Sequence, residues 1–171
     1  MSVLDQFKLD DKVAIVTGGA SGLGKAMGKA LAEAGANLVI ADMNLEVGQE
    51  TAKEFEEATD NKAIACEVDV TNLEQVNAMV KETMDTFGHI DILFNNAGIN
   101  EHVKFEDMPY DRWKKTMDVN LNSMVLVTNA VGEVFRKQQH GVIVNTSSMS
   151  GVIVNSPQPQ AAYNTSKVCL L

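Results

Sequence analysis

The sequence predicts an α/β domain built on a doubly wound, parallel β-sheet. Five short apolar runs suit buried strands, and they alternate with stretches that carry helical spacing. The segments richest in glycine, amide, hydroxyl and acidic side chains each follow a predicted strand, as in open α/β sheets that bind ligands at the carboxyl ends of their strands. The predicted strands span residues 13–16, 37–42, 63–68, 90–94 and 142–145.

The composition fits one globular domain over residues 1–171, with 45% hydrophobic and 22% charged residues. The net charge of −9 argues against a nucleic-acid partner or an anionic membrane surface, since no basic cluster is present. No apolar run has the roughly 18 residues of a membrane span, and residues 1–7 lack a signal-peptide pattern. Cys66 and Cys169 lack Cys-x-x-Cys partners, and no His lies at ligand spacing. We therefore expect a cytoplasmic protein without a metal site.

The first predicted strand runs into a glycine-rich turn. Gly18, Gly22 and Gly24 follow it at Gly-x3-Gly-x-Gly spacing, and a helix is expected over residues 25–34. Strand, glycine turn and helix N-terminus in this order form a phosphate cradle, because the backbone can approach an anion and the helix offers unpaired N–H groups. The alternative is a tight turn with a purely structural role.

The second predicted strand, residues 37–42, ends in Asp42. In a dinucleotide-binding fold, a carboxylate at this point accepts hydrogen bonds from the adenosine ribose and repels the 2′-phosphate of NADP. Asp42 lies 18 residues after Gly24 (42 − 24), close to the expected spacing of ~20. We therefore expect NAD as the ligand. The alternative is a solvated acid that caps the next helix.

The following segments continue the alternation. Residues 45–58 predict an exposed helix, and residues 73–87 predict a helix with one apolar stripe, which Asp69 is expected to cap. The fourth strand is closed by Asn95-Asn96-Ala97-Gly98, whose small residues allow close backbone approach while its amides can tie neighbouring strands; the alternative is a generic turn. Residues 109–139 predict two helices that merge near residues 118–120.

Tyr163 and Lys167 lie four residues apart, so on a helix they share one face. A free tyrosine titrates near ~10 and is a poor base at neutral pH, but a neighbouring ammonium and an oxidised nicotinamide both favour the phenolate. Such a tyrosine can deprotonate an alcohol while hydride leaves the carbon, and reduction reverses these steps. A serine hydroxyl can hold the substrate oxygen beside it. Alone, the pair is no more than two residues on one helix face.

Taken in order, five motifs resemble those of the short-chain dehydrogenase/reductase family over essentially the whole chain. They are Thr17-Gly-x3-Gly-x-Gly24, Asn95-Asn-Ala-Gly98, Asn120, Ser147-Ser-x-x-Gly151 and Tyr163-x3-Lys167. The resemblance implies a Rossmann-like fold and an oxidoreductase that uses NAD. It also implies contact between Asp69 and the adenine ring, a role compatible with a helix cap.

By this resemblance, Ser148 orients the substrate, Tyr163 is the acid/base, Lys167 binds the ribose and tunes Tyr163, and Asn120 supports a proton-relay water. The implied cofactor-binding residues are Thr17, Gly18, Ser21, Gly22, Leu23, Gly24, Asp42, Asp69, Val70, Asn96, Ala97, Gly98, Tyr163 and Lys167. Ser150 is the alternative to Ser148, since many family members place the serine 13 residues before the tyrosine and Ser148 lies 15 before it (163 − 148).

The loop 152–160 resembles members that act on sugars and polyols, so we expect a secondary alcohol of that class to be interconverted with a ketone. A reductase of 3-oxoacyl thioesters or other ketones is the alternative. By this resemblance, family members usually continue about 80 residues further, which would give a domain within the usual range of sizes. We therefore expect a truncated chain with C-terminal strands missing, an uncovered sheet edge at the fifth strand, weak NADH binding and negligible turnover.

A third possibility is a non-catalytic nucleotide-binding or oligomerisation module. Residues 120–139 and the start of the Tyr163 helix resemble the subunit interface of the family. By that resemblance the full-length protein is expected to be a homo-oligomer, a dimer or a tetramer.

Overall fold

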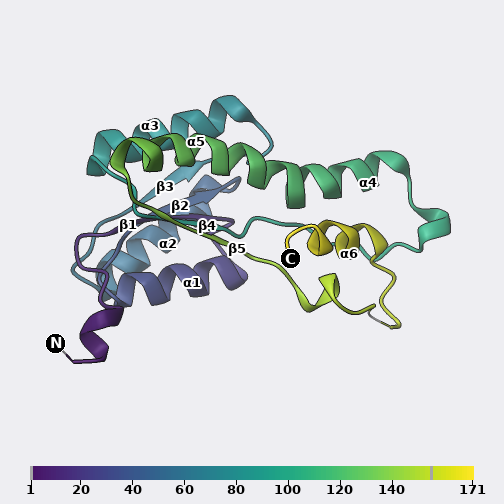
Figure 1. The fold of residues 1–171 in the computed structure, drawn as a ribbon, viewed down its shortest axis with the longest axis horizontal. Helices are drawn as coiled ribbons and strands as arrows, with labels where there is room; N and C mark the ends of the chain where they lie inside the picture. The colour runs from purple at the N-terminus through teal and green to yellow at the C-terminus, as the bar shows by residue number, and fades with distance from the viewer. Residues whose placement is uncertain (1, 155) are drawn as a thin grey trace.

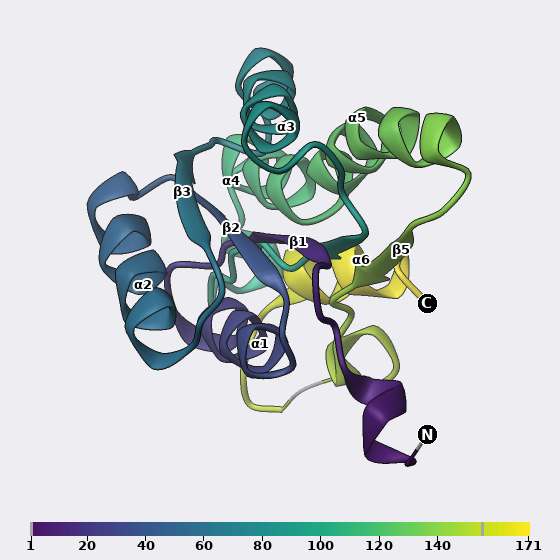
Figure 2. The same cartoon turned by 90° about the vertical axis from the view of Figure 1, so that its left-hand side faces the viewer.

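A computed structural model describes residues 2–154 and 156–171 as a parallel sheet between two layers of helices (Figures 1 and 2). Asn155, within the predicted loop 152–160, lies outside the described residues. The strands are β1 Val13–Thr17, β2 Asn37–Asp42, β3 Ala63–Glu67, β4 Ile92–Asn95 and β5 Val142–Asn145. The α-helices are α1 Gly22–Glu33, α2 Leu45–Ala58, α3 Leu73–Phe87, α4 Tyr110–Met117, α5 Ser123–Gln138 and α6 Ala161–Val168.

The five described strands are all parallel and lie in the order β3-β2-β1-β4-β5. The chain therefore winds from β1 outward to β3 on one side, then crosses back to β4 on the other. This reversal between β1 and β4 is the point where open α/β sheets bind ligands. The predicted fold class is confirmed.

Successive residues of β1 point to opposite faces of the sheet and enter two separate cores. Val13 and Ile15 pack in a cluster with residues of α3 and α5, whereas Ala14 and Val16 pack with residues of α1 and α2. Figure 2 shows α1 and α2 on one face and α3 and α5 on the other. A strand that is buried on both faces must be apolar throughout, which explains the continuous run in β1.

Asparagine side chains, not aspartates, cap two of the helices. The predicted cap from Asp69 to α3 is wrong, because Asn72 accepts hydrogen bonds from the backbone N–H groups of Glu74 and Gln75. Asp69 instead accepts from the backbone N–H of Thr71 at 2.9 Å and from its hydroxyl. Likewise the side chain of Asn44 caps α2. The alternative role considered for Asp42, as the cap of this helix, is therefore wrong.

A π-helical turn, Asp118–Asn122, joins α4 to α5. Its wide geometry shows in the hydrogen bond from the backbone N–H of Ser123 to the carbonyl of Asp118, five residues earlier. The two helices form one long rod in Figure 1, which confirms their predicted merger near residues 118–120.

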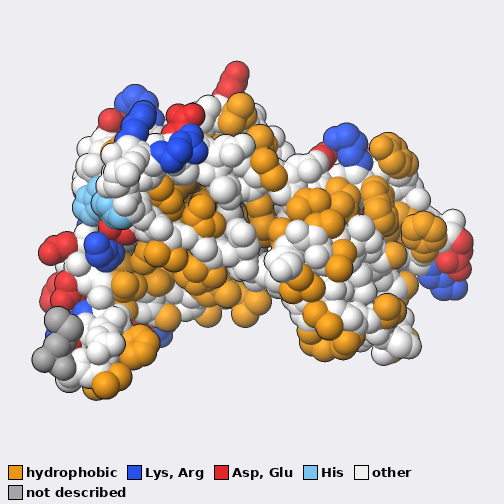
Figure 3. Space-filling view, in the orientation of Figure 1, with side chains coloured by type: hydrophobic (Ala, Val, Ile, Leu, Met, Phe, Trp, Pro, Cys, Tyr) orange, Lys and Arg blue, Asp and Glu red, His pale blue; other side chains and the backbone are white. Residues whose placement is uncertain are grey.

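The outer strand β5 leaves apolar side chains uncovered. Val142, Ile143 and Val144 are 57%, 37% and 36% exposed, and Figure 3 shows hydrophobic side chains along the path that β5 follows in Figure 1. The expected uncovered edge is thus confirmed. Within residues 2–154 and 156–171, no helix is both long and apolar enough to span a bilayer.

Candidate active site

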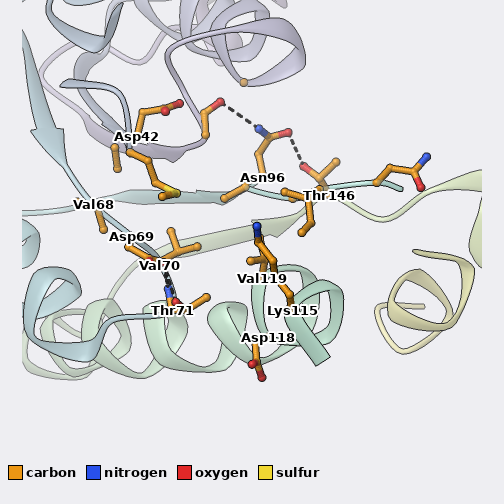
Figure 4. Close-up of a pocket in the computed structure, with 18 of the residues that line it drawn as sticks. Asp42, Val68, Asp69, Val70, Thr71, Asn96, Lys115, Asp118, Val119 and Thr146 are labelled. Atoms are coloured by element: carbon orange, nitrogen blue, oxygen red, sulfur yellow. Dashed lines mark hydrogen bonds between the residues drawn. The ribbon is translucent and has the colours of Figure 1, made fainter. Parts of the chain in front are cut away.

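A cleft of about 800 Å³ opens at the carboxyl ends of the strands (Figure 4). Its walls come from the segments that follow β1, β2, β3, β4 and β5, together with α4 and α6. The predicted cofactor residues that line it are Gly18, Ser21, Leu23, Gly24, Asp42, Asp69, Val70, Asn96, Ala97, Gly98, Tyr163 and Lys167. Thr17, Gly22, Asn120 and Ser148 do not line it.

The glycine turn brings the start of α1 against the end of β1. Gly18 has φ +63°, in the left-handed region. A Cβ on Gly24 would lie 2.0 Å from the carbonyl oxygen of Gly18, so a side chain there has no room. Helix α1 begins at Gly22, three residues before the predicted start, and the side chain of Ser21 does not cap it. The first N–H groups of α1 are thus left for another acceptor at the cleft.

Thr17 lies behind the cleft and joins the ends of β1 and β4. Its hydroxyl donates to the carbonyl of Phe94 at 3.3 Å and accepts from the N–H groups of Asn96 and Ala97 at 2.9 and 3.1 Å. Its position in the structure therefore supports a bracing role for the cleft wall rather than contact with a ligand.

Asn96 ties together the loops after three strands. Its amide nitrogen donates to the carbonyl oxygens of Thr17 and Gly18 at 3.1 and 3.4 Å, and its amide oxygen accepts from the Thr146 hydroxyl at 3.3 Å. Asn95 similarly donates to the side chain of Asn145 on β5. The prediction that these amides tie neighbouring strands is confirmed, and the loops after β1, β4 and β5 are held at fixed separations.

The Asp42 carboxylate lies at the rim of the cleft beside the glycine turn. One oxygen accepts from the backbone N–H of Ala20 at 3.2 Å and the other from the N–H of Asn44 at 3.1 Å. Lys25, the first cation after the turn, forms an ion pair with Glu54 at 2.6 Å. The carboxylate is therefore fixed at a position where it adds negative charge to this end of the cleft.

Lys167 is a buried ammonium that also lines the cleft. The residue is 2% exposed, its Nζ donates to the carbonyl of Thr146 at 2.7 Å, and it lies 5.7 Å from the centre of the Tyr163 ring. No carboxylate of the described residues pairs with it, and burial lowers its pKa. A buried cation without a counter-charge is unfavourable, which is expected where a bound group supplies acceptors.

Asn120 is fully buried and does not face the cleft. Its amide accepts from the N–H of Ile99 at 2.8 Å and donates to the Ile99 carbonyl at 2.9 Å and to the Ser166 hydroxyl at 3.0 Å. Ser166 in turn donates to the carbonyl of Tyr163 at 2.7 Å. Because these partners occupy its amide, the side chain of Asn120 links the loop after β4 to α6.

The two candidate serines differ in what their hydroxyls contact. Ser148 is half-buried and accepts from the backbone N–H of Ser150 at 3.1 Å. Ser150 is 6% exposed, and its hydroxyl accepts from the Gln160 amide at 3.0 Å. Gln160 also accepts from the amide of Asn100 at 2.9 Å. A buried hydroxyl held in such a chain is less available to a substrate, which favours Ser148.

Sequence reasoning missed several residues that line the cleft. Thr146, directly after β5, could have been found because it follows a strand as the other site residues do. Lys114 and Lys115 on α4 carry no such signal. Their place at the cleft follows from how α4 packs, which a helical pattern does not give.

A family model described as short chain dehydrogenase matches residues 12–171. A sorbose reductase of Candida albicans is 40% identical over 168 residues, which cover 97% of this chain and 59% of the relative. A "probable NADP-dependent mannitol dehydrogenase" of Yarrowia lipolytica is 37% identical, covering 99% and 62%. Among solved structures, an NAD⁺-bound xylitol dehydrogenase is 35% identical with a TM-score of 0.89, covering 95% and 62%.

The chain thus spans about 60% of the length of the curated relatives quoted. These relatives are named as sugar and polyol oxidoreductases. The solved xylitol dehydrogenase has the same fold as this chain and is also similar to it in sequence. The family model covers nearly every described residue, including the glycine turn and the Tyr163–Lys167 pair. The chain belongs to the short-chain dehydrogenase family.

Proposed function

We propose that this chain forms the nucleotide-binding and acid/base part of an NAD(H)-dependent oxidoreductase that interconverts a secondary alcohol, of the polyol or sugar class, with a ketone. The observation that carries the proposal is the buried ammonium of Lys167 beside the ring of Tyr163, at a cleft that the glycine turn also lines. The names of the sugar and polyol relatives support the substrate class.

The residues of the cleft fit a dinucleotide. Gly18, Gly22 and Gly24 carry no side chain that would cover the backbone of the turn, and Gly24 has no room for one because a Cβ there would meet the Gly18 carbonyl. No side chain caps the N-terminus of α1, so its first N–H groups can bind a phosphate. Lys167 has donors to spare beyond its bond to Thr146 and is placed to hold ribose hydroxyls. When bound, the oxidised nicotinamide would accept the hydride from the alcohol carbon.

In this mechanism the protein moves one proton and holds the substrate oxygen. Tyr163, as phenolate, takes the proton of the alcohol, and the nearby ammonium of Lys167 stabilises the phenolate charge. Ser148 holds the substrate oxygen by its hydroxyl. Asn120 fixes α6 through Ser166 and thereby the position of Tyr163. In reduction, Tyr163 returns the proton.

NAD rather than NADP is proposed on the position of Asp42 and on the lack of a free cation near it. Residues 18–24 include no Lys or Arg, and Lys25 is paired with Glu54. A 2′-phosphate would therefore meet the Asp42 carboxylate without a compensating charge.

Titration of the chain with NADH and NADPH, followed by fluorescence, tests the binding half of the proposal. NADH should bind and NADPH should bind more weakly; equal affinities would remove the NAD assignment. Incubation with NAD⁺ and polyols, or with NADH and 3-oxoacyl thioesters, tests the reaction. The chain alone is expected to show negligible turnover. A version extended to the length of the relatives should turn over polyols and lose that activity in Tyr163→Phe, while NADH binding is kept. Turnover with thioesters alone would replace the polyol assignment by the ketone-reductase alternative.

The exposed apolar strand β5 supports a second candidate, an association module. Size-exclusion chromatography with light scattering would show a dimer or tetramer in that case. A monomer at all accessible concentrations would count against it.

A further inference from the structure

The cleft presents an excess of acidic groups to an anionic ligand. The acidic residues Asp42, Asp69, Asp111 and Asp118 line it, although the Asp118 carboxylate points away and is paired with Lys114, and the whole chain has a net charge of −9. A dinucleotide brings two phosphate charges into this field. The glycine turn answers them with backbone N–H groups only, because residues 18–24 have no cationic side chain. Some other cation at the cleft is therefore needed to offset the repulsion.

In the part of the chain that the structure describes, three lysines line the cleft, and two of them are engaged. Lys167 donates to the Thr146 carbonyl and lies 5.7 Å from the centre of the Tyr163 ring, and its remaining donors are proposed above for the ribose hydroxyls. Lys114 forms an ion pair with Asp118, the first residue of the π-helical turn after α4. This pair lowers the pKa of the Asp118 carboxyl and raises that of Lys114.

Lys115 is the third of these lysines. Its side chain is exposed, and its ammonium has no hydrogen bond or ion pair with any residue in 2–154 or 156–171. Figure 4 shows it reaching from α4 into the cleft toward Asn96, whereas Asp118 points away. Asn96 is bonded to the carbonyl oxygens of Thr17 and Gly18, at the start of the glycine turn. Lys115 therefore projects toward the glycine turn from the facing wall of the cleft.

We propose that Lys115 is a cofactor-binding residue that neutralises the diphosphate of the dinucleotide across the cleft from the glycine turn. This inference rests on the proposed NAD-binding function and adds a cationic contact to it. Asp42 lies apart from Lys115 in Figure 4. That separation favours the diphosphate over the 2′-phosphate of NADP as the group that Lys115 meets.

The test is calorimetric or fluorescence titration of the 171-residue chain with NADH, NADPH, ADP and adenosine. Trp113, the single tryptophan, lies two residues from Lys115 and offers an intrinsic reporter. Lys115→Met should weaken NADH and ADP about five-fold, the size of effect expected of one exposed charge pair. Adenosine, which has no phosphate, should bind Lys115→Met as it binds wild type. Added salt should narrow the difference between the two proteins.

Two further variants control for charge and fold. Lys115→Arg should keep NADH affinity within about two-fold. Lys137→Met removes the same charge from an exposed position on α5 away from the cleft and should leave the affinity unchanged. Thermal unfolding of each variant should match wild type, since both side chains are exposed.

Each contrary result has a definite meaning. Equal NADH affinities of Lys115→Met and Lys137→Met would overturn the role of Lys115 while leaving the proposed function in place. A loss confined to NADPH would make Lys115 a reader of the 2′-phosphate and overturn the diphosphate assignment. An equal loss for adenosine would show that the side chain acts by shape. Failure of wild type to bind any of the nucleotides would overturn the proposed function and this inference together.

Discussion

The Nζ of Lys167 lies 5.7 Å from the centre of the Tyr163 ring, with both residues on α6 and the lysine almost wholly buried. The helix that presents the proposed acid/base thus also carries the cation that stabilises its phenolate form. Because the two residues are one turn apart on the same helix, their separation is set locally and does not depend on the rest of the fold.

In wild type, the free energy of unfolding is expected to rise with pH on the alkaline side because of Lys167, and Lys167→Met should remove this rise. Burial lowers the pKa of Lys167, so between its folded-state value and its ordinary value of 10.5 the unfolded chain binds more protons than the folded chain. The free energy of unfolding of wild type should therefore rise with pH in this window relative to Lys167→Met. Urea unfolding at about pH 7 and about pH 10 measures the difference. A difference that stays constant with pH would contradict the prediction.

Replacement of Asp91 with Asn is expected to destabilise the fold by about 2 kcal/mol at neutral pH. Burial raises the pKa of the Asp91 carboxyl, but bonds from the Val13 N–H (2.9 Å) and the Lys12 ammonium (3.1 Å) outweigh it, so the pKa lies below its usual 3.8. This stabilisation is present above the unfolded-state pKa and is lost as pH falls through the folded-state pKa.

Urea unfolding of Asp91→Asn and wild type near pH 7 and near pH 3 would show this loss as a shrinking difference. Asp85→Asn is the control, since Asp85 pairs with Lys81 on an exposed helix face and should contribute less than about 0.5 kcal/mol. Equal effects of the two substitutions would argue against a special role for the buried carboxylate.

Gly24→Ala is expected to destabilise the chain more than Gly22→Ala. The added methyl at position 24 would meet the Gly18 carbonyl at 2.0 Å, so the backbone must move, at about 2–3 kcal/mol. At Gly22 nothing lies within 4 Å, and only the left-handed backbone, with φ +54°, opposes the change, at about 1 kcal/mol. Thermal unfolding ranks the two variants, and the reverse order would refute the packing argument.

Asp42→Ala is expected to narrow the preference for NADH over NADPH. The substitution removes the carboxylate that would repel a 2′-phosphate, and it also removes an acceptor for the ribose hydroxyls. The ratio of the two dissociation constants measures the effect. Asp111→Ala provides the control, because Asp111 is another acid that lines the cleft but lies on α4. If it changes the ratio equally, the preference reflects general charge and not the position of Asp42.

Ser150→Ala is expected to lower stability by about 1 kcal/mol, since it leaves the buried amide of Gln160 without its acceptor. Ser148→Ala removes a bond within one short turn and should lower stability less, while reducing any turnover more. Denaturant unfolding and a dehydrogenase assay on both variants separate the two roles. A larger activity loss in Ser150→Ala, with stability unchanged, would assign the substrate contact to Ser150.

The sheet could be predicted from the sequence because a strand that is buried on both faces consists of consecutive apolar residues, as in β1. It also placed α2, α3 and β5 correctly, since each is bounded by clear turn residues. The start of α1 was predicted at residue 25, because Gly22 and Gly24 are poor helix formers in isolation. Packing against the end of β1 overrides that propensity.

Side-chain partners within the site were harder to foresee. Asp69 and Asn72 are both good helix caps by type, and only the local backbone decides that Asn72 reaches the first turn of α3. For Asn120, the sequence position indicated a place in the site, but its bonds to Ile99 and Ser166 depend on contacts between distant segments. The roles of the site residues remain proposals that the variants above can test.

The π-helical turn Asp118–Asn122 acts as a phase shift between two parts of one helical rod. It lets α4 aim Lys115 at the cleft while α5 keeps Val127 and Val131 in the core. Each residue in an α-helix advances by about 100° around the axis. Deleting a single residue from the turn would therefore rotate α4 by about that angle relative to α5 and carry Lys115 out of the cleft. A deletion that spares Asn120, the buried residue of this turn, would thus move the cationic side chain of the ligand site while α5 keeps its place.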